Sequence, residues 1–126
     1  MKRIIFTEKA PKPIGPYSQG VMVDNTIFVS GQIAINPATG TLVIDNIIEE
    51  TKQVMENISA ILTAAKMNFT HVIQTTIFLK DMNNFTAVNE TYGSYFKGDY
   101  PARATVQVSR LPKDVNVEIS VIATEE

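Results

Sequence analysis

The sequence contains no cysteine and a single histidine, His71. The absence of thiols excludes disulfides, thiolate nucleophiles and sulfur-ligated metal sites. One imidazole is too few for a histidine-based metal centre, so we expect no bound metal. A chain without cysteine also fits a reducing compartment.

An excess of positive charge and long apolar runs are missing as well. The chain has 11 Lys and Arg against 13 Asp and Glu, a net charge of −2, which provides no basic field to hold nucleic acid or anionic lipid. The apolar run near the N-terminus is shorter than a signal-peptide core, and no stretch has the length of a membrane span. We therefore expect a cytoplasmic protein.

The 126 residues, 44% hydrophobic and 19% charged, fit one domain over residues 1–126. Apolar and polar residues alternate in the expected strands, and apolar residues recur every three or four positions in the expected helices. The order is β-β-β-α-β-α-β-β, an α+β fold with two helices on one face of a mixed sheet. The expected strands cover residues 3–7, 18–23, 26–30, 71–79, 103–109 and 115–121, and the expected helices cover residues 47–67 and 84–96.

Local signals indicate where these elements end. The pair Asp24-Asn25 predicts a tight hairpin, and residues 36–40 predict a turn. Asp45 or Asn46 can cap the first helix, and Asn68 is a candidate left-handed stop. The polar side of this helix is expected to face solvent with Lys52, Gln53, Glu56, Asn57 and Lys66. The second helix, capped by Asn83 or Asn84, is expected to turn inward Phe85, Val88, Tyr92 and Tyr95.

Two helices cover only one face of such a sheet. The other face still receives one side chain from each of three pairs: Val21 or Met22, Ile27 or Phe28, and Ile33 or Ile35. An uncovered apolar face of this kind favours oligomerisation through the sheet.

Arg103 and Glu118 are the main candidates for chemistry, because each lies on the polar side of an alternating strand. If Val108 opposes Val115 in an antiparallel pair, Arg103 and Glu118 are diagonal neighbours, about 7–8 Å apart at the backbone. The guanidinium fork suits a carboxylate ligand, and a partly buried glutamate can carry a proton. The alternative is a solvated sheet face with a surface ion pair worth about 0–1 kcal/mol.

Two other segments are weaker candidates. Tyr17 lies in a loop, residues 10–20, that is rich in proline and glycine and could aim its hydroxyl into a pocket. The run Ser30-Gly31-Gln32 ends a strand with a glycine, where a backbone can approach a ligand closely. Taken alone, the tyrosine is more often a packing residue and the glycine more often marks a strand end.

Five segments together resemble one known family. "IGPYSQG", "SGQIAINPATG", "LKDMNNF", "VNETYGSYF" and "PARATVQVSRLPKDVNVEIS" occur in the order and spacing of the RidA/YjgF family of enamine/imine deaminases. The resemblance covers essentially the whole chain. It implies a chorismate-mutase-like α+β fold and a homotrimer whose sheets face inward in a barrel-like core. It also implies clefts between subunits, so that Arg103 and Glu118 could meet across an interface.

The resemblance further implies a reaction that uses no metal or cofactor. The substrates are 2-iminobutanoate and 2-iminopropanoate with their enamine tautomers, 2-aminocrotonate and 2-aminoacrylate, which are hydrolysed to 2-oxo acids and ammonia. Pyridoxal-phosphate enzymes such as threonine and serine dehydratases release these reactive compounds. The sequence leaves open which imine is preferred and which dehydratase supplies it.

Residue by residue, the resemblance implies three catalytic side chains. Arg103 holds the substrate carboxylate, Glu118 positions or activates water, and Tyr17 lines the pocket. The implied substrate-binding residues are Arg103, Thr105, Ser30, Gly31 and Asn89. Thr105 stands where many members carry cysteine, which removes any thiol role there.

Two other functions remain open at this point. One is a regulatory or chaperone trimer that binds small molecules, which would need the arginine but not the glutamate. The other is an endoribonuclease or translation inhibitor, as some relatives are described. The net charge of −2 and the lack of a basic-aromatic stripe argue against RNA.

Overall fold

The computed structural model describes residues 1–126 and contains one six-stranded sheet and two α-helices. The strands are β1 (Lys2–Ile5), β2 (Gly20–Val23), β3 (Thr26–Gln32), β4 (Val72–Leu79), β5 (Ala102–Gln107) and β6 (Val117–Thr124). The helices are α1 (Ile47–Ala64) and α2 (Phe85–Gly93), with short 3₁₀ helices η1 (Phe69–His71), η2 (Met82–Asn84) and η3 (Pro112–Asp114). The predicted order of strands and helices is confirmed.

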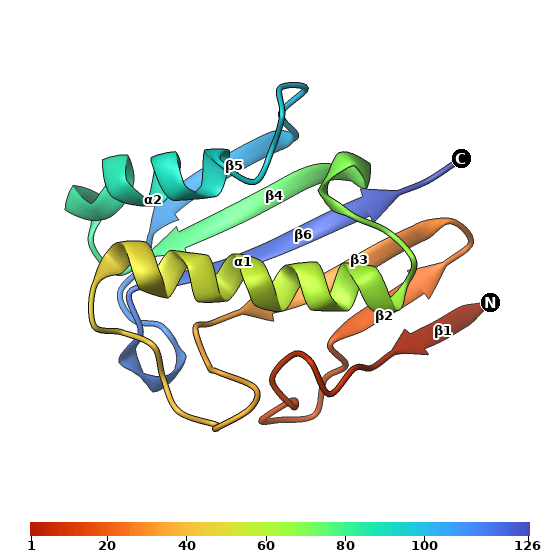
Figure 1. Ribbon diagram of the computed structural model, residues 1–126, viewed down its shortest axis with the longest axis horizontal. Helices are drawn as coiled ribbons and strands as arrows, with labels where there is room; N and C mark the ends of the chain where they lie inside the picture. The colour runs from red at the N-terminus through yellow and green to blue at the C-terminus, as the bar shows by residue number, and fades with distance from the viewer.

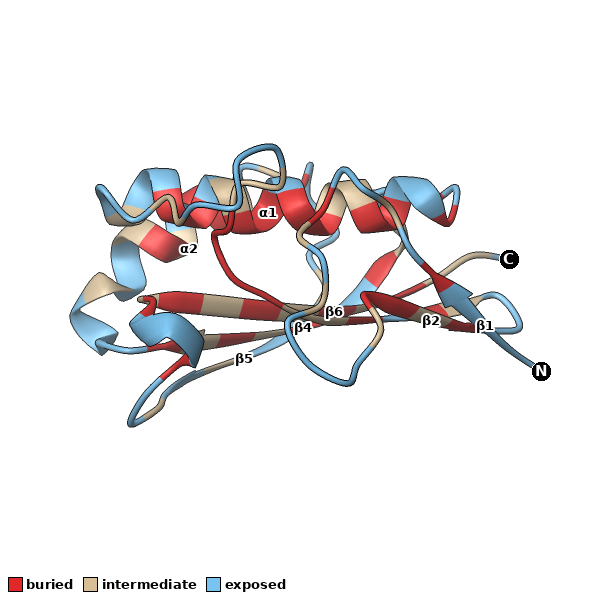
Figure 2. Ribbon diagram, turned by 90° about the horizontal axis from the view of Figure 1, so that it is seen from below, coloured by how far each residue is buried: buried red, intermediate tan, exposed pale blue.

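Both α-helices pack on the same face of the sheet (Figure 2). The strand order is β1-β2-β3-β6-β4-β5 (Figure 1). All neighbouring strands are antiparallel except β4 and β5, which are parallel. A parallel pair needs a crossover connection, and α2 supplies it between β4 and β5. The sheet is therefore mixed, and the predicted α+β fold is confirmed.

The core lies between the helices and the sheet. One face of α1 is fully buried through Val54, Met55, Ile58, Ile61 and Leu62, at the expected three- and four-residue spacing. Strand β6 alternates along its length between buried residues on the helix side and half-buried residues on the other side. We call this other side the open face. No helix of the structure is long and apolar enough to cross a membrane.

The predicted ends of α1 are correct at the start and wrong at the finish. Asn46 caps the helix, and its side chain accepts a hydrogen bond from the Glu49 amide at 2.9 Å. The helix ends at Ala64, and the left-handed residue that follows it is Lys66, with φ of 62°. Asn68, the predicted stop, has extended backbone and caps η1 instead.

Two predicted side-chain orientations are wrong. Asn57 does not face solvent: it is buried, because the chain that follows β3 runs over that side of α1. Phe85 does not point into the core, because the first turn of α2 lies beside the edge strand β5 and the ring remains exposed. Helix α2 also ends at Gly93, three residues before the predicted end at 96. Asn84 precedes α2 but makes no capping hydrogen bond with its side chain.

The predicted pairing of the last two strands is wrong as well. Strand β4 lies between β5 and β6 and pairs with both of them. Val108 therefore does not oppose Val115, and the diagonal contact expected between Arg103 and Glu118 does not form.

Candidate active site

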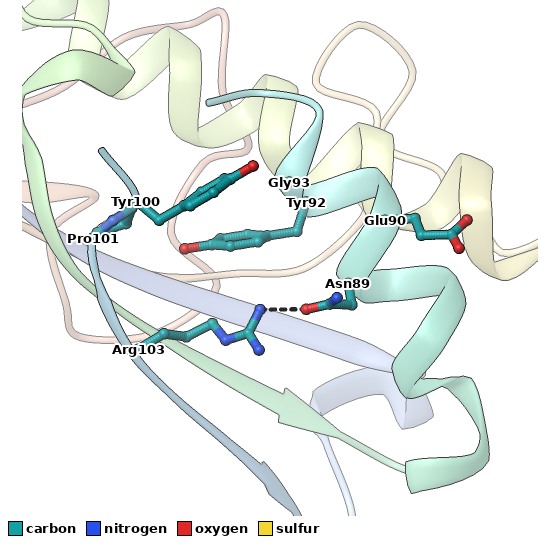
Figure 3. Close-up of a pocket in the computed structure, with 7 residues that line it drawn as sticks. All are labelled: Asn89, Glu90, Tyr92, Gly93, Tyr100, Pro101 and Arg103. Atoms are coloured by element: carbon teal, nitrogen blue, oxygen red, sulfur yellow. Dashed lines mark hydrogen bonds between the residues drawn. The ribbon is translucent and has the colours of Figure 1, made fainter. Parts of the chain in front are cut away.

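Arg103 extends from the edge strand β5 toward α2 (Figure 3). Its partner in register on β4 is Thr75, which is buried on the helix side of the sheet. Its Nη1 atom donates a hydrogen bond to Asn89 Oδ1 at 2.6 Å. The guanidinium carbon lies 5.4 Å from the ring centroid of Tyr92 and 5.6 Å from that of Phe85. Three residues on one face of α2 thus hold the guanidinium by a hydrogen bond and two cation–π contacts.

The aromatic contact through Tyr92 is itself fixed. The Tyr92 and Thr75 hydroxyls share a hydrogen bond of 2.8 Å beneath the guanidinium. Burial raises the pKa of the Tyr92 hydroxyl, although the Thr75 bond and the charge of Arg103 act in the opposite direction. The hydroxyl therefore stays protonated at neutral pH and serves to orient the ring.

A cavity of about 710 Å³ opens beside this arginine. Its lining consists of Asn89, Glu90, Tyr92, Gly93, Tyr100, Pro101 and Arg103 (Figure 3). No carboxylate forms an ion pair with Arg103 in the structure. Since Asn89 accepts only one of the five guanidinium N–H groups, the others are free to bind an anionic ligand.

Thr105 follows Arg103 on the same side of β5. Its partner in register is Ile77, a core residue of β4. The Thr105 hydroxyl oxygen is buried and has no hydrogen-bond partner within the chain. A buried hydroxyl without a partner is unusual and is explained if a ligand or a second chain supplies one.

Glu118 lies on the open face. Its partner in register on β4 is Phe78, whereas the partner of Arg103 is Thr75. Phe78 and Thr75 are an odd number of residues apart, so Glu118 and Arg103 point to opposite faces of the sheet. The Glu118 side chain makes no hydrogen bond or ion pair, and burial raises the pKa of the carboxyl above its ordinary value. A half-buried carboxyl with a raised pKa is a candidate general acid or base.

Gly31 makes room for the Glu118 carboxyl. A Cβ atom on Gly31 would overlap Glu118 Oε2 and come within 2.8 Å of Cδ. The ladder between β3 and β6 shifts register between Val29 and Gln32, which marks an irregularity at this point of the sheet. The glycine therefore permits a close approach that any other residue would block.

Ser30 attaches the preceding loop to this strand end. Its amide donates to the Gln19 carbonyl at 2.9 Å, and its hydroxyl donates to the Ser18 carbonyl. Tyr17, next in the loop, is 44% exposed, and its hydroxyl accepts a hydrogen bond from the Ile14 amide at 3.2 Å. The loop is held beside Gly31, but the structure shows no contact from Tyr17 to Arg103 or Glu118.

The sequence-predicted residues thus form two groups. Arg103, Asn89 and Thr105 lie at the β5 edge, and Glu118, Gly31 and Ser30 lie at the end of β3, with the Tyr17 loop attached. Phe85 and Tyr92, which contact Arg103, were not predicted as site residues, although their spacing from Asn89 was a visible signal. No cluster of three or more histidine, aspartate or glutamate side chains has the geometry of a metal site.

Comparisons with known proteins identify close relatives along the whole chain. A family model described as Endoribonuclease L-PSP matches residues 7–125. A RutC family protein from Pyrococcus horikoshii is 55% identical over 126 residues, which is 100% of both chains. A 2-iminobutanoate/2-iminopropanoate deaminase from Homo sapiens is 50% identical over 125 residues, 99% of this chain and 91% of that protein. The crystal structure of E. coli TdcF with bound serine has a TM-score of 0.95 and 41% identity, and covers 98% of this chain and 99% of that one.

Proposed function

This chain belongs to the RidA/YjgF family, to which the L-PSP model corresponds, and we propose that it is a hydrolytic deaminase of small 2-imino acids and their enamine tautomers. The substrates are 2-iminobutanoate and 2-iminopropanoate, and the products are the 2-oxo acid and ammonia. The observation that carries the proposal from the chain's own residues is an arginine without an ion-pair partner at the border of a cavity. A half-buried glutamate with a raised pKa in the same fold supports it. The relative named for this reaction is 50% identical.

Arg103 binds the carboxylate of the substrate in this proposal. Asn89, Phe85 and Tyr92 hold the guanidinium in place, so little side-chain entropy is lost when the ligand binds. E. coli TdcF, a similar structure, has been solved with bound serine, an amino acid that carries the same α-carboxylate. Thr105 offers its unpartnered hydroxyl next to the arginine.

Glu118 acts as the general base and then as the general acid in this proposal. Water attacks the carbon of the protonated imine while Glu118 accepts a proton from the water, which forms a neutral tetrahedral hydroxy-amine. The protonated carboxyl then gives that proton to the amine nitrogen. The C–N bond breaks as the C=O bond forms, the Glu118 carboxylate accepts the hydroxyl proton, and ammonia leaves. A carboxyl with a raised pKa suits both steps, because it accepts a proton more readily than an ordinary glutamate does and can return it. Tyr17, Ser30 and Gly31 border this carboxyl in the proposal.

A second copy of the chain completes the site in this proposal. Arg103 and Glu118 lie on opposite sides of one sheet, so one subunit does not present both groups to a single substrate. The open face exposes Val23, Phe28 and Val106 by more than 40% each, and their burial against other subunits is favourable. We therefore propose a homotrimer with a barrel-like core, in which each cleft receives Arg103 from one subunit and Glu118 from its neighbour.

Two further points belong to the proposal. The predicted cytoplasmic location stays a prediction. We do not propose RNA cleavage despite the name of the family model, because the net charge is −2 and the cavity contains a single arginine rather than a basic track.

The test measures how much of the imine remains after the protein is added. A dehydratase acting on threonine or serine generates the imine, and semicarbazide traps whatever is not hydrolysed. We expect the protein to suppress trapping in proportion to its concentration. Unchanged trapping in the presence of assembled, folded protein would contradict the proposed reaction and would favour a binding role.

A further inference from the structure

Helix α1 carries three buried polar residues, Glu50, Thr51 and Asn57. The Thr51 hydroxyl donates to the Ile47 carbonyl of the same helix, whereas Glu50 and Asn57 bind segments outside it. Glu50 and Asn57 are 0% and 1% exposed and lie seven residues apart, two helical turns along the same face. Polar groups in such positions are unfavourable unless their hydrogen bonds are satisfied. Each of them is satisfied, and the partners indicate what the two residues do.

Glu50 binds the chain immediately before Glu118. Its Oε2 atom accepts hydrogen bonds from the Asn116 amide at 2.7 Å and the Val117 amide at 3.3 Å. Its Oε1 atom accepts a third from Asn116 Nδ2 at 2.7 Å. From the other side, the Asn116 carbonyl accepts a bond from the Lys80 amide at 3.0 Å. The start of β6, two residues before Glu118, is thus fixed to α1.

Asn57 binds the chain immediately after Gly31. Its Nδ2 atom donates to the Ile33 carbonyl at 3.1 Å and to the Ile35 carbonyl at 3.0 Å. Gln53, one turn earlier, donates to Asn57 Oδ1 at 2.9 Å and so sets the orientation of the amide. The segment that follows β3 is therefore fixed to the same helix as the start of β6.

We propose that Glu50 and Asn57 are positioning residues that set the location of the Glu118 carboxyl relative to Gly31, by fixing both backbone segments to α1. The inference rests on the proposed function, in which Glu118 handles the protons. Neither residue contacts Glu118, Arg103 or the cavity.

The position of the Glu118 carboxyl depends on the position of its backbone, because no other group binds the carboxyl. No side chain donates a hydrogen bond to it, no cation pairs with it, and the raised pKa has burial as its only cause. The residue beside it on β4 is Phe78 and the residue beneath it is Gly31, neither of which carries a charge. A small shift of either segment changes both the burial of the carboxyl and its distance from a bound imine.

The first test removes the Glu50 carboxylate. We expect Glu50→Ala to lower kcat by about 10²-fold, the loss that follows when a reacting group is misplaced by about 1 Å. KM should change little, because Arg103 lies at the opposite edge of the sheet. The matched control is Glu49→Ala, which removes an exposed carboxylate from the neighbouring position of the same helix and should retain wild-type kcat.

A conservative variant separates positioning from charge. In Glu50→Gln, the side-chain oxygen can accept from the Asn116 and Val117 amides. The new NH₂ group can donate to Asn116 Oδ1 once that amide rotates by 180°. We expect Glu50→Gln to restore most of the activity lost in Glu50→Ala. Asn57→Asp keeps the shape but opposes a carboxylate to two carbonyl oxygens, so we expect it to lower kcat as Glu50→Ala does.

A spectroscopic readout distinguishes this inference from the proposed function. The carboxyl ¹³C resonance of Glu118 reports its pKa in the ligand-free protein by NMR titration. We expect the pKa to fall toward the ordinary glutamate value in Glu50→Ala and Asn57→Asp, as the carboxyl gains contact with water, and to stay raised in Glu50→Gln. This result is obtained even if wild-type protein hydrolyses no imine.

Variants that lose stability do not obscure the result, because urea unfolding identifies conditions in which each one is folded. A folded Glu50→Ala variant with wild-type kcat and wild-type Glu118 titration would overturn the inference and leave Glu50 a purely structural residue. Loss of kcat in Glu50→Gln equal to that in Glu50→Ala would overturn it too, since the contacts that position Glu118 are retained there.

Discussion

Arg103 and Glu118 extend from opposite faces of the same sheet. Arg103 is aligned with the buried Thr75 and reaches Asn89 of α2, whereas Glu118 is aligned with Phe78 and lies over Gly31 on the open face. The first has its guanidinium beside a cavity, and the second has a carboxyl whose pKa is raised by burial. If both act on one substrate, as we propose, that substrate binds where two subunits meet.

Removal of the arginine should weaken substrate capture without unfolding the protein, because Arg103 is exposed on an edge strand. We expect Arg103→Ala to lower kcat/KM by about 10²-fold, which corresponds to a charge-assisted pair of about 3 kcal/mol. Arg103→Lys keeps the charge but loses the planar fork, and should recover only part of the loss. The matched control is Arg110→Ala, an exposed arginine outside the cavity. Wild-type kcat/KM in Arg103→Ala would contradict the carboxylate-binding role.

The Glu118 carboxyl should make stability depend on pH. Because its pKa is raised in the folded protein, the folded state binds more protons than the unfolded state above pH 4.5, the ordinary value. Stability should therefore fall as pH rises from 4.5 through the raised pKa, and partial exposure to solvent limits the size of the effect. We expect Glu118→Gln to be more stable than wild type at pH 7 and equally stable below pH 4.5.

Urea unfolding at matched protein concentration checks this dependence, with Glu49→Gln as the exposed-carboxylate control. The same variant should lose the rise of kcat/KM with pH that ionisation of Glu118 produces. A wild-type pH–rate profile in Glu118→Gln would exclude the proton role, whatever the unfolding data show.

Gly31 should be required because the absence of a side chain leaves room for Glu118, and not because its backbone needs a conformation that only glycine adopts. It is not among the residues with positive φ, so alanine can adopt its conformation. The added Cβ would lie 2.8 Å from Glu118 Cδ and 3.1 Å from Cγ, so the glutamate must move. We expect Gly31→Ala to lower kcat by about 10- to 100-fold.

A double-mutant cycle gives the control for Gly31. In a Glu118→Ala background no carboxyl remains to be displaced, so Gly31→Ala should cost little further activity. Equal losses in the two backgrounds would mean that Gly31 acts on the site by another route, such as close approach of its backbone to the ligand.

The sequence predicted the secondary-structure elements and the candidate site residues better than it predicted which of them lie next to one another in the fold. Alternation along residues 103–109 correctly separates two faces of a strand, but it does not tell which strand lies alongside or which face meets the helices. The structure turns Arg103 and Thr105 to the helix side of the sheet and leaves Val106 exposed on the open face, the reverse of the usual polar-outside rule. Only long-range pairing with β4 determines this orientation.

The burial of Glu50 and Asn57 on α1 was likewise not predictable from the sequence. The 3.6-residue period places Asn57 beside the polar side of the helix, and nothing local indicates that the segment after β3 covers it. Glu50 lies among charged neighbours in the sequence, yet its carboxylate is enclosed by the start of β6, some 66 residues further along the chain. Burial of both is decided by tertiary contacts, which a period cannot report.

Mixing Arg103→Ala subunits with Glu118→Ala subunits tests whether each active site is built from two subunits. In a ring of three, an Arg103→Ala subunit still provides Glu118, and a Glu118→Ala subunit still provides Arg103. Any trimer that contains both kinds has one interface in which an intact Arg103 faces an intact Glu118. Random assembly of equal amounts makes three quarters of the trimers mixed, so about a quarter of the wild-type activity should return.

Differently tagged subunits, unfolded and refolded together, allow mixed trimers to be isolated and their composition to be confirmed by mass spectrometry. The control is each variant refolded alone, which should keep only its low residual activity. Recovery of about one active site per mixed trimer supports a cleft built from two chains. Mixed trimers without activity would show that Arg103 and Glu118 do not combine across an interface. In that case their separation by the sheet would exclude joint action on one substrate, and the catalytic role of Glu118 would have to be abandoned.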